Sequence, residues 1–582
     1  MPPQGRPPPA APATAAARTS ARPTSATSTT TSTTTSASPP TPWPTAAITH
    51  LRDDDALHRA LAELQTRHPA ALGLLVLLAA PHPDLPREAA HDPRRLRAEL
   101  LALAAEGQVF ILHLACFSAL HPLQTLLAGD GEPPYVVFHD AHFALAALQP
   151  LGIDPPRFGC TLTAATLLAE GAPRGHDDLD LARLIAQHLH HGLPGQVQQG
   201  QVIPAIARYP VAAAAADCLV PLLRALTPTL RERGLARLYE LECRLLPSVL
   251  AMEGAGLGLD VAGFNHIAAG WQREKDAAPP PERLAQLDKL LSTYAHWARD
   301  FVADDGRMRP HLHPLATDSG RFACSQPNLQ QVPAEHTAPG LRACFVPAPG
   351  MVFIIADYAQ IELRVAAQLA PCPALRQVFR DGRDPHRATA ATLAGKPESE
   401  ISAHERKLAK AVNFGFLFGM GARRFQEYAL GSYGLVLEPT AAQAARDAFF
   451  ATFPGIAAWH RKVGNWEPRS HREDITVTTA LGRRKRFPAG HFSFNAALNI
   501  PVQGTAAEGF KKAMIDLHAV LGPIGGRGVL CVHDEYLAEV PEDRAEAARL
   551  LVQSTMESAM ATVVPGVPIV AEAHIARSWA DK

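Results

Sequence analysis

The chain has 582 residues, of which 47% are hydrophobic and 19% are charged, and its formal net charge is −1. This composition is typical of a globular protein with several domains and excludes a wholly disordered or collagen-like chain. The net charge neither supports nor excludes a nucleic-acid partner, because a basic binding surface could be local.

The eight cysteines are scattered singly along the chain, with no C-x-x-C pair. This spacing argues against a cysteine zinc site or a disulfide framework and fits a reducing compartment. No apolar run approaches the roughly 20 residues that a membrane span needs, so we expect no membrane contact.

Residues 1–45 form a tail of Pro, Ala, Ser and Thr that contains three Arg and no acid. Such a segment cannot bury enough apolar surface to order itself, so we expect a disordered tail. An organelle transit peptide has a similar composition, but this tail lacks an amphipathic apolar stripe. A cytoplasmic protein of a bacterial or phage-infected cell, associated with the nucleoid, is therefore favoured over an organellar one.

Residues 46–225 alternate short apolar runs with helical stretches. The segments 72–80, 108–115 and 135–141 are predicted strands, and 143–153 is a predicted helix. This alternation predicts an α/β domain. Residues 235–260 place apolar side chains at helical spacing before a Gly-rich stop, which predicts a long amphipathic helix.

Beyond about residue 309 two apolar segments each deliver an acid. The run MVFIIADY (351–358) contains Asp357, and GVLCVHDEYLAEV (528–540) contains Asp534. Taken alone, Asp534 is most simply a residue of a tight turn. If the two strands are neighbours, however, the two carboxylates repel one another unless divalent cations bridge them, as in phosphoryl-transfer sites.

Residues 404–421, HERKLAKAVNFGFLFGMG, place Arg406, Lys410, Phe414 and Phe418 four residues apart, on one stripe of a predicted helix. This ladder suits a nucleoside triphosphate, with the two cations on phosphates and Phe414 against the base or sugar. A solvated basic edge above aromatic core residues explains the same pattern equally well.

The blocks TDSGRFACSQPNLQQVP, DYAQIELR, DPHRATAA, ERKLAKAVNFGFLFGMG, GRRKRFP, NIPVQGTAAEGFKKAM and VHDE occur in this order and cover most of residues 311–540. In this they resemble the polymerase domain of bacterial DNA polymerase I, family A. The resemblance implies a multidomain chain of α/β and α+β class, in which an RNase H-like, exonuclease-type α/β domain precedes a right-hand polymerase. The implied domains are a tail (1–45), a degenerate 3′–5′ exonuclease-like domain (46–225), a shortened thumb (226–310), the first part of the palm (311–370), the fingers (371–480) and the second part of the palm (481–582).

The resemblance also implies roles for individual residues. The implied catalytic residues are Asp357, Asp534, Lys410 and Glu535, and the implied metal ligands are Asp357, Asp534 and the backbone carbonyl of Tyr358. The implied nucleotide-binding residues are Arg406, Lys410, Phe414, Phe418, Gln360, Glu362 and His386. The implied DNA-binding residues are Arg321, Asn328, Asn499, Gln503 and His533.

The implied activity is template-directed DNA synthesis from dNTPs on a primer–template, with two Mg²⁺ ions, for which Mn²⁺ could substitute. We expect a monomer and leave a processivity or repair partner open. A single-subunit RNA polymerase or reverse transcriptase is the alternative within nucleotidyl transfer, and Glu362 argues for deoxynucleotides. A non-catalytic DNA-binding protein on a polymerase fold is the alternative outside it.

The chain departs from the family pattern at several positions. Phe418 stands where the family usually has a Tyr that can bond the acid matching Glu362, which predicts weaker discrimination against ribonucleotides. Asn495 replaces an Arg that contacts the primer strand, and the basic segment 482–488 could compensate for it. Only about sixty residues separate Asp260 from Arg321, so the thumb is short and we expect low processivity.

The region resembling the proofreading domain lacks most of its acids. No acid lies between Glu63 and Asp84, where the first Asp-x-Glu pair is expected. Ala144 replaces an expected Asp and Ala213 an expected Tyr, so that only Asp217 remains. We therefore expect a retained fold without exonuclease chemistry, and the tail is too short to hold a 5′-nuclease domain.

Overall fold

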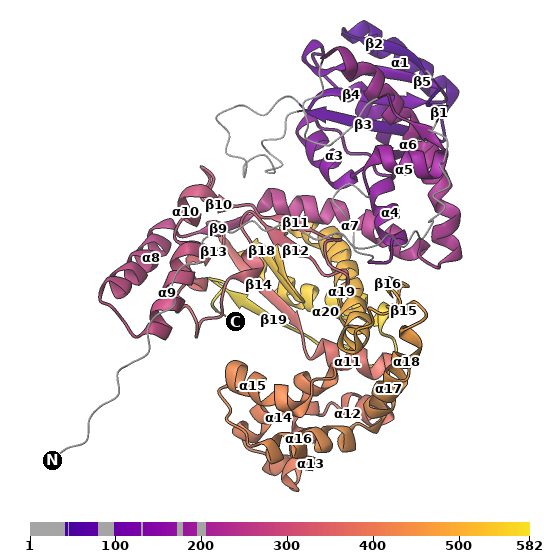
Figure 1. Ribbon diagram of the computed structural model, residues 1–582. Coiled ribbons are helices and arrows are strands. Elements are labelled where there is room, and N and C mark those ends of the chain that lie inside the picture. Colours follow the sequence, from indigo (N-terminus) through magenta and orange to yellow (C-terminus); the bar gives the residue numbers. More distant parts are fainter. Residues whose placement is uncertain are drawn as a thin grey trace, which may run out of the picture. The chain divides into compact units, whose positions relative to one another are not determined.

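The computed structural model describes residues 41–44, 46–78, 98–129, 132–171, 179–194 and 205–581, with the side chains of 205–207 excepted (Figure 1). Most of the expected disordered tail, and with it the transit-peptide alternative, lies outside the described residues. The tail was expected to reach residue 45, but β1 (Thr41–Pro42) already pairs in parallel with β8 (His191–Gly192). The end of the tail therefore moves back to residue 40 or earlier.

The N-terminal region contains a mixed sheet of six strands in the order β2-β5-β4-β3-β6-β7. Strand β4 is antiparallel to both of its neighbours, and the other pairings are parallel. The strands predicted at 72–80, 108–115 and 135–141 are confirmed within the described residues as β3, β5 and β6. The six strands are β2 (Ala47–Leu51), β3 (Ala71–Leu78), β4 (Ala98–Ala105), β5 (Gln108–His113), β6 (Tyr135–Phe138) and β7 (Phe158–Cys160).

Helices cover both faces of this sheet, which is why β3 is apolar without alternation. Leu74 and Val76 of β3 belong to a core with α1, α2 and α3, whereas Leu75 and Leu77 belong to a second core with α4, α5 and α6. Successive side chains of a strand point to opposite faces, so a strand buried on both sides needs apolar residues throughout. The helices are α1 (Asp54–Arg67), α2 (His121–Ala128), α3 (Ala141–Leu148), α4 (Thr161–Leu168), α5 (Leu181–Leu189) and α6 (Ala205–Glu232).

Helix α6 is long and apolar, a feature that the sequence reading did not recognise. Its segment Arg208–Glu232 has 25 residues, and the most apolar 18-residue stretch within it has a mean hydropathy of 1.4, enough by length and composition alone to cross a membrane. It packs on β3 so closely that a Cβ on Gly73 would lie 2.1 Å from the carbonyl oxygen of Ala216. Because 56% of its most apolar stretch is buried in the protein, we assign α6 to the core of the α/β region. The domain boundary expected between residues 225 and 226 falls inside this helix.

The predicted amphipathic helix at 235–260 is α7 (Ala236–Ala255), and it is shared by two cores. Cys243, Leu246 and Leu250 pack into the core of the α/β region, whereas Leu245 and Val249 pack into the core of the C-terminal region. Two helices that contact one another, α8 and α9, follow it (Figure 1). The elements of this segment are β9 (Leu257–Leu259), α8 (Val261–Asp276), α9 (Pro281–Tyr294), α10 (Trp297–Asp300), β10 (Arg307–Met308), β11 (His311–His313), β12 (Ala323–Ser325) and β13 (Phe345–Val346).

The C-terminal region contains an antiparallel sheet in the order β17-β18-β14-β19, with helices α19 and α20 packed against it. Its two central strands, β14 and β18, belong to the segments 351–358 and 528–540, which contain the acids Asp357 and Asp534. The pairing of β14 with β18 joins residues about 180 positions apart, with Asp357 opposite Glu535. These elements are β14 (Met351–Tyr358), α19 (Phe494–Leu521), β17 (Arg527–Val532), β18 (Glu535–Pro541), α20 (Ala545–Val563) and β19 (Ala571–Ala576).

Between β14 and α19 the chain forms a helical segment (Figure 1). The helix predicted within residues 404–421 is α14, whose start is fixed by a capping box between Ser402 and Glu405 and which ends at Leu417, so that Phe418 caps the helix instead of lying on it. The elements of this segment are α11 (Ile361–Leu369), α12 (Pro373–Arg380), α13 (Pro385–Ala394), α14 (Ala403–Leu417), α15 (Ala422–Tyr433), α16 (Pro439–Thr452), α17 (Pro454–Gly464), α18 (Glu467–Ser470), β15 (Ile475–Thr478) and β16 (Arg484–Phe487).

Candidate active site

Two acids from distant segments meet at one end of the C-terminal sheet. Asp534 lies in the two-residue turn between β17 and β18, because Val532 pairs with Glu535 across the hairpin. Asp357 lies on the adjacent strand β14, opposite Glu535. The turn holds His533 at a φ of 59°, a backbone conformation that favours glycine. The sequence offered a tight turn or a metal site as alternatives for Asp534, whereas the structure places it in a tight turn beside a second acid.

The electrostatics of the site show that the two carboxylates act on one another. The pKa of Asp534 is raised to about 6, mainly by burial and then by the negative charges of Asp357 and Glu362, while a backbone hydrogen bond and Arg321 oppose the rise. A divalent cation bound by both acids would remove this repulsion, and carboxylate oxygens are the donors that hard cations prefer. The residues present therefore fit a divalent metal site.

Two neighbours of these acids have side chains with other partners. The hydroxyl of Tyr358 donates a hydrogen bond to the carbonyl of Met556 at 2.8 Å inside the core, so only the backbone of Tyr358 is available as the expected ligand. Glu535 is buried and accepts a hydrogen bond from the indole N–H of Trp579 at 2.9 Å. The sequence analysis missed Trp579, which lies three residues from the end of the chain.

Arg321 and Glu362, expected to bind DNA and the sugar respectively, form an ion pair of 2.8 Å in this structure. Burial and then the charge of Arg321 lower the pKa of His533, whereas Glu362 and Glu535 oppose that change. These residues therefore share one electrostatic environment with Asp534, as the predicted roles require.

The predicted stripe on α14 is the solvent-facing side of that helix. Arg406, Phe414 and Phe418 are partly exposed and Lys410 is exposed, while Ala409, Ala411, Val412 and Asn413 between them are buried. The partial exposure of Phe414 argues against the alternative of a core residue at that position, whereas Phe418 packs against the core, as that alternative expects. Within the part of the chain that the structure describes, Lys410 forms no ion pair.

Arg406 has a partner that the sequence analysis did not identify. Its Nε lies 2.5 Å from Oδ2 of Asp384, the residue that caps α13. Burial opposes ionisation of Asp384, but its hydrogen bonds from Arg406 and from the backbone of His386 lower its pKa. His386 is buried, bonded to Asn413 at 2.9 Å, and its pKa is lowered to about 4 by burial. Its ring lies 5.9 Å from that of Phe414, so it lies beside the stripe.

The amide residues expected to bind DNA contain unpaired polar atoms. Among the described residues no group donates a hydrogen bond to the buried Oδ1 atoms of Asn328 and Asn499. Buried polar atoms are rarely left without a partner, so both are suited to a ligand. Gln503 is partly exposed on α19, and Gln360 caps α11 with a φ of 49°.

The two substituted positions of the family pattern touch one another. The side-chain amide of Asn495 donates a hydrogen bond to the backbone carbonyl of Phe418 at 2.6 Å. Asn495 therefore holds the C-terminal end of α14. Within the described residues Glu362 accepts a hydrogen bond from Arg321 at 2.8 Å, in the absence of a tyrosine hydroxyl at position 418.

The basic segment 482–488 is engaged within the protein. Arg484 pairs with Glu170 at 2.6 Å and Lys485 with Asp318 at 2.7 Å. Arg483 is buried against Glu242, and Arg486 lies 3.2 Å from Asp474. Each basic side chain already has an acidic partner, and compensation for Asn495 at the primer strand stays a prediction.

Asp217, the one acid of the expected exonuclease set that remains, also has a partner. The indole N–H of Trp43 donates a hydrogen bond to Asp217 at 2.9 Å. Ala144 and Ala213 are buried, and every described residue of β3 is apolar or glycine. Buried apolar side chains thus occupy the positions at which the family pattern places exonuclease residues.

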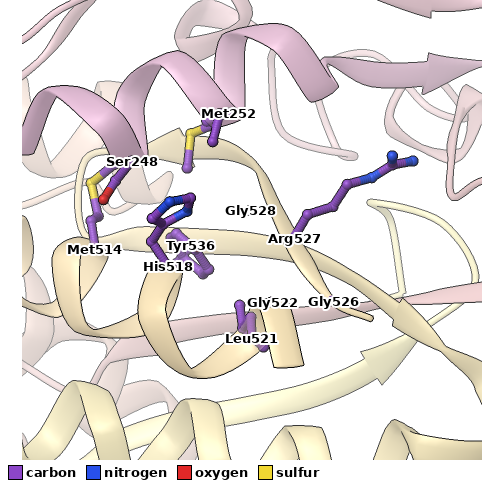
Figure 2. Close-up of a pocket in the computed structure, with 11 residues that line it drawn as sticks. Ser248, Met252, Met514, His518, Leu521, Gly522, Gly526, Arg527, Gly528 and Tyr536 are labelled. Atoms are coloured by element: carbon purple, nitrogen blue, oxygen red, sulfur yellow. The ribbon is translucent and has the colours of Figure 1, made fainter. Parts of the chain in front are cut away.

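A small cavity of about 80 Å³ lies elsewhere, between α7, α19 and β17 (Figure 2). Met252, Met514 and Tyr536 line it together with His518 and glycines of the β17 region, and it includes none of the predicted site residues. We therefore do not assign the activity to this cavity.

Comparisons with known proteins agree with the geometry. The sequence pattern of the family described as DNA polymerase family A matches residues 281–581, just over half of the chain. The chain is 38% identical to the thermostable DNA polymerase I of Thermus filiformis over 308 residues, which is 51% of this chain and 35% of that protein. It is 28% identical to DNA polymerase I of Aquifex aeolicus over 564 residues, which is 83% of this chain and 94% of that protein.

Among solved structures, the chain is similar to the POL domain of Pol1 from M. smegmatis, which was solved in complex with a DNA primer-template and dNTP. The TM-score is 0.75, the sequence identity is 22%, and the similarity covers 91% of this chain and 99% of that chain. At this identity the similarity establishes the fold alone. The residue roles stay predictions.

Proposed function

Because the chain belongs to DNA polymerase family A, we propose that it synthesises DNA on a primer–template from deoxynucleoside triphosphates. The observation that carries this proposal is the meeting of Asp357 and Asp534 at the end of β14 and the β17–β18 turn. Survival of both acids and of the cationic stripe on α14 is hard to reconcile with a purely DNA-binding protein, since such costly charges would be lost first.

In this proposal the C-terminal sheet is the palm, the helical segment from α11 to α18 is the fingers, and α8 with α9 is the thumb. Asp357, Asp534 and the backbone carbonyl of Tyr358 hold the cations. When bound, two Mg²⁺ ions, or Mn²⁺ in their place, would lower the pKa of the primer 3′-hydroxyl and neutralise charge on the triphosphate.

The protein's own part is positioning and charge, as is usual in phosphoryl transfer. Arg406 and Lys410 contact the phosphates, and Lys410 gives a proton to the leaving pyrophosphate. Phe414 packs against the base or sugar. Glu362 lies under the sugar once Arg321 turns from it to the DNA, and Glu535, held by Trp579, supports the metal site.

Asn328, Asn499, Gln503 and His533 contact the template–primer. The unpaired oxygens of the two asparagines support this role, because a DNA donor would satisfy them. The junction of α8 and α9 contributes little charge to a grip on DNA, since Arg283 pairs with Glu274 and Lys275 with Asp288, each at 2.7 Å. A thumb whose cations are partly neutralised grips fewer phosphates, so we propose low processivity.

We also propose that the α/β region has an RNase H-like fold and no proofreading activity. Asp217, the one acid retained, is bonded to Trp43, and a two-metal site needs several carboxylates. The enzyme acts as a monomer.

A primer-extension assay tests the proposal. The wild-type protein and Asp534→Asn are compared on a gapped duplex and on a long single-stranded template, with dNTPs and rNTPs in parallel reactions. The exposed Asp447 supplies a matched control, Asp447→Asn. We expect extension with dNTPs by the wild type and the control only, with primer–template binding nearly equal in all three. Near-normal extension by Asp534→Asn, or extension with rNTPs alone, would contradict the assignment.

A further inference from the structure

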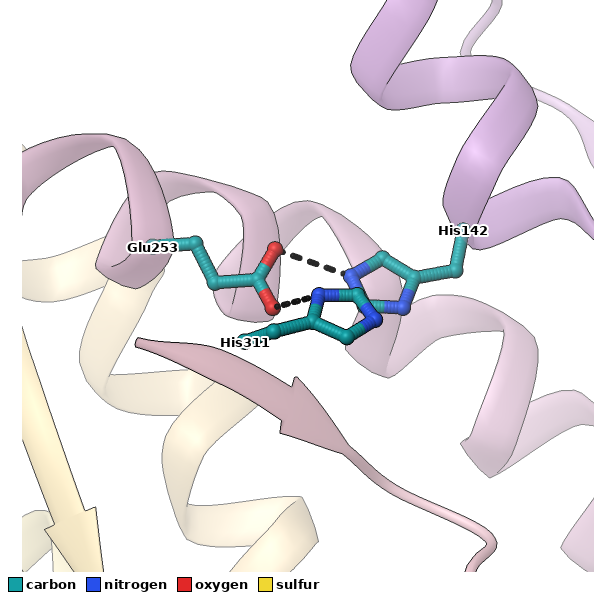
Figure 3. Close-up of side chains that lie close together, drawn as sticks. All are labelled: His142, Glu253 and His311. Atoms are coloured by element: carbon teal, nitrogen blue, oxygen red, sulfur yellow. Dashed lines mark hydrogen bonds and ion pairs between the residues drawn. The ribbon is translucent and has the colours of Figure 1, made fainter. Parts of the chain in front are cut away.

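Two histidines and one glutamate from three distant elements converge outside the proposed active site (Figure 3). His142 lies on α3, Glu253 near the end of α7, and His311 at the start of β11. The ligand atoms of this His–Glu–His cluster all lie within 4.8 Å of one another. None of the three residues has a part in the proposed polymerase chemistry.

The two imidazoles face opposite oxygens of one carboxylate. Nε2 of His142 lies 2.9 Å from Oε2 of Glu253, and Nδ1 of His311 lies 3.1 Å from Oε1. The two rings are stacked, with their centroids 5.1 Å apart and their planes 10° apart. Three donor atoms thus point into one small volume from two sides.

The carboxylate is held in place by the backbone. Oε1 of Glu253 accepts a hydrogen bond from the N–H of Leu312 at 2.7 Å, and the glutamate side chain is only 1% exposed. Hydrogen bonds of this kind, from groups that do not bind the metal themselves, orient the ligands of metal sites. His142 is 14% and His311 26% exposed, so a cation could reach the cluster from solvent.

The charge balance favours a single dication over two protons. If both imidazoles were protonated, two stacked cations would share one carboxylate and repel one another. A dication between the three donors supplies the same total charge at the point that all of them face, and it leaves both imidazoles neutral. Two imidazole nitrogens with one carboxylate oxygen form a donor set that Zn²⁺ and similar transition metals prefer over Mg²⁺.

We propose that His142, Glu253 and His311 bind one transition-metal dication of the Zn²⁺ class. The site ties α3 of the α/β region to α7 and β11, with solvent as the remaining ligand. No sequence motif marks this site, because the ligands lie more than fifty residues apart and include no cysteine.

The test uses the full-length protein, stripped with a chelator and kept in excess Mg²⁺, which occupies carboxylate sites. Zn²⁺ binding is measured by competition with a chromophoric chelator for the wild type, His142→Gln, His311→Gln and the control His471→Gln, a change at an exposed histidine. We expect one Zn²⁺ more in the wild type and the control than in the two variants, whose affinity for it should fall at least about 100-fold.

Two further readouts do not depend on polymerase activity. Co²⁺ should give the strong visible absorption of a four-coordinate nitrogen-ligated ion in the wild type but not in either variant. Zn²⁺ should raise the melting temperature of the wild type and leave that of the variants unchanged. If wild type and both variants bind Zn²⁺ alike, or if Co²⁺ gives only a weak octahedral spectrum, the cluster is an ion-pair contact and the proposal is wrong. Each histidine variant tests it independently should the other fail to fold.

Discussion

The burial of Asp534 and its repulsion by Asp357 predict that Asp534→Asn stabilises the metal-free protein while it abolishes DNA synthesis. Folding raises the pKa of Asp534 from 3.8 to about 6. An acid whose pKa is raised on folding destabilises the folded state wherever it is charged, and protonation removes that penalty as the pH falls from about 6 toward 3.8. At about 1.36 kcal/mol per pKa unit, the penalty at neutral pH is at most about 3 kcal/mol.

The gain from the substitution should be smaller than this limit. The side chain keeps some exposure to solvent, which screens the repulsion. Asparagine is also a buried polar group that needs partners of its own. We therefore expect Asp534→Asn to raise the free energy of unfolding by about 1–2 kcal/mol at pH 7.5, which is roughly 1–2 °C in melting temperature for a chain of this size.

The assay is chemical and thermal unfolding in a chelating buffer, with Asp447→Asn as the control for loss of one negative charge. Mg²⁺ is then added, and it should stabilise the wild type by up to about 2.7 kcal/mol at one hundred times its Kd. It should leave Asp534→Asn nearly unchanged. A variant that is less stable than the wild type without metal would refute the reasoning, since it would mean that favourable partners hold the charged Asp534. An equal Mg²⁺ effect on both proteins would refute the metal site.

Four further experiments test the proposed active site, the thumb and the α/β region. Arg406→Ala should raise the KM for dNTPs roughly 10- to 100-fold, the loss of a charge-assisted hydrogen bond, while steady-state DNA binding stays the same; an unchanged KM would remove Arg406 from the nucleotide site. Phe418→Tyr should lower the ratio of ribonucleotide to deoxynucleotide incorporation in competition assays, and identical ratios would dismiss the role given to the missing hydroxyl. Extension in the presence of a DNA trap should give short products, whereas long products from single binding events would contradict the weak thumb. Asp534→Asn protein should not shorten 3′-labelled single strands in Mg²⁺, and shortening that persists in it would show a surviving exonuclease.

Local pattern predicted the long elements well but missed strands of unsuitable composition. The segment AELLALAA (98–105) consists of strong helix formers, yet it is β4, a central strand between β3 and β5. The segment AEAHIA (571–576) likewise forms β19 beside β14. In both, pairing with neighbouring strands outweighs intrinsic propensity, and that pairing is not encoded locally.

The sequence predicted those site residues that stand as acids at the end of an apolar strand or in a turn. It did not predict the residues that pair with them or with the basic side chains, because those partners are remote in sequence. Asp357 and Asp534 stand out in sequence because burial makes an unpaired charge costly. The ion pair of Arg406 with Asp384 and the bond from Trp579 to Glu535 join residues 22 and 44 positions apart without any periodic signal. Only the folded chain shows that these charges already have partners.

The ion pairs of the basic segment 482–488 were unpredictable for the same reason. Its partners Glu242 and Glu170 lie in the α7 helix and the α/β region, hundreds of residues earlier. Glu242 also binds Lys511 at 2.7 Å, and burial lowers the pKa of that lysine to about 8. Removing one partner of such a buried network leaves uncompensated charge, typically at a cost of about 3–5 kcal/mol.

The packing of α7 ties the α/β region to the C-terminal region. The core of the α/β region includes one face of α7, whose other face packs beneath the catalytic sheet, so removing the region would expose Cys243, Leu246 and Leu250. Buried acids are costly when no metal pairs with them, and in our proposal the buried alanines Ala144 and Ala213 occupy the places of an expected Asp and an expected Tyr. The packing of α7 therefore requires the fold of the α/β region independently of any exonuclease chemistry.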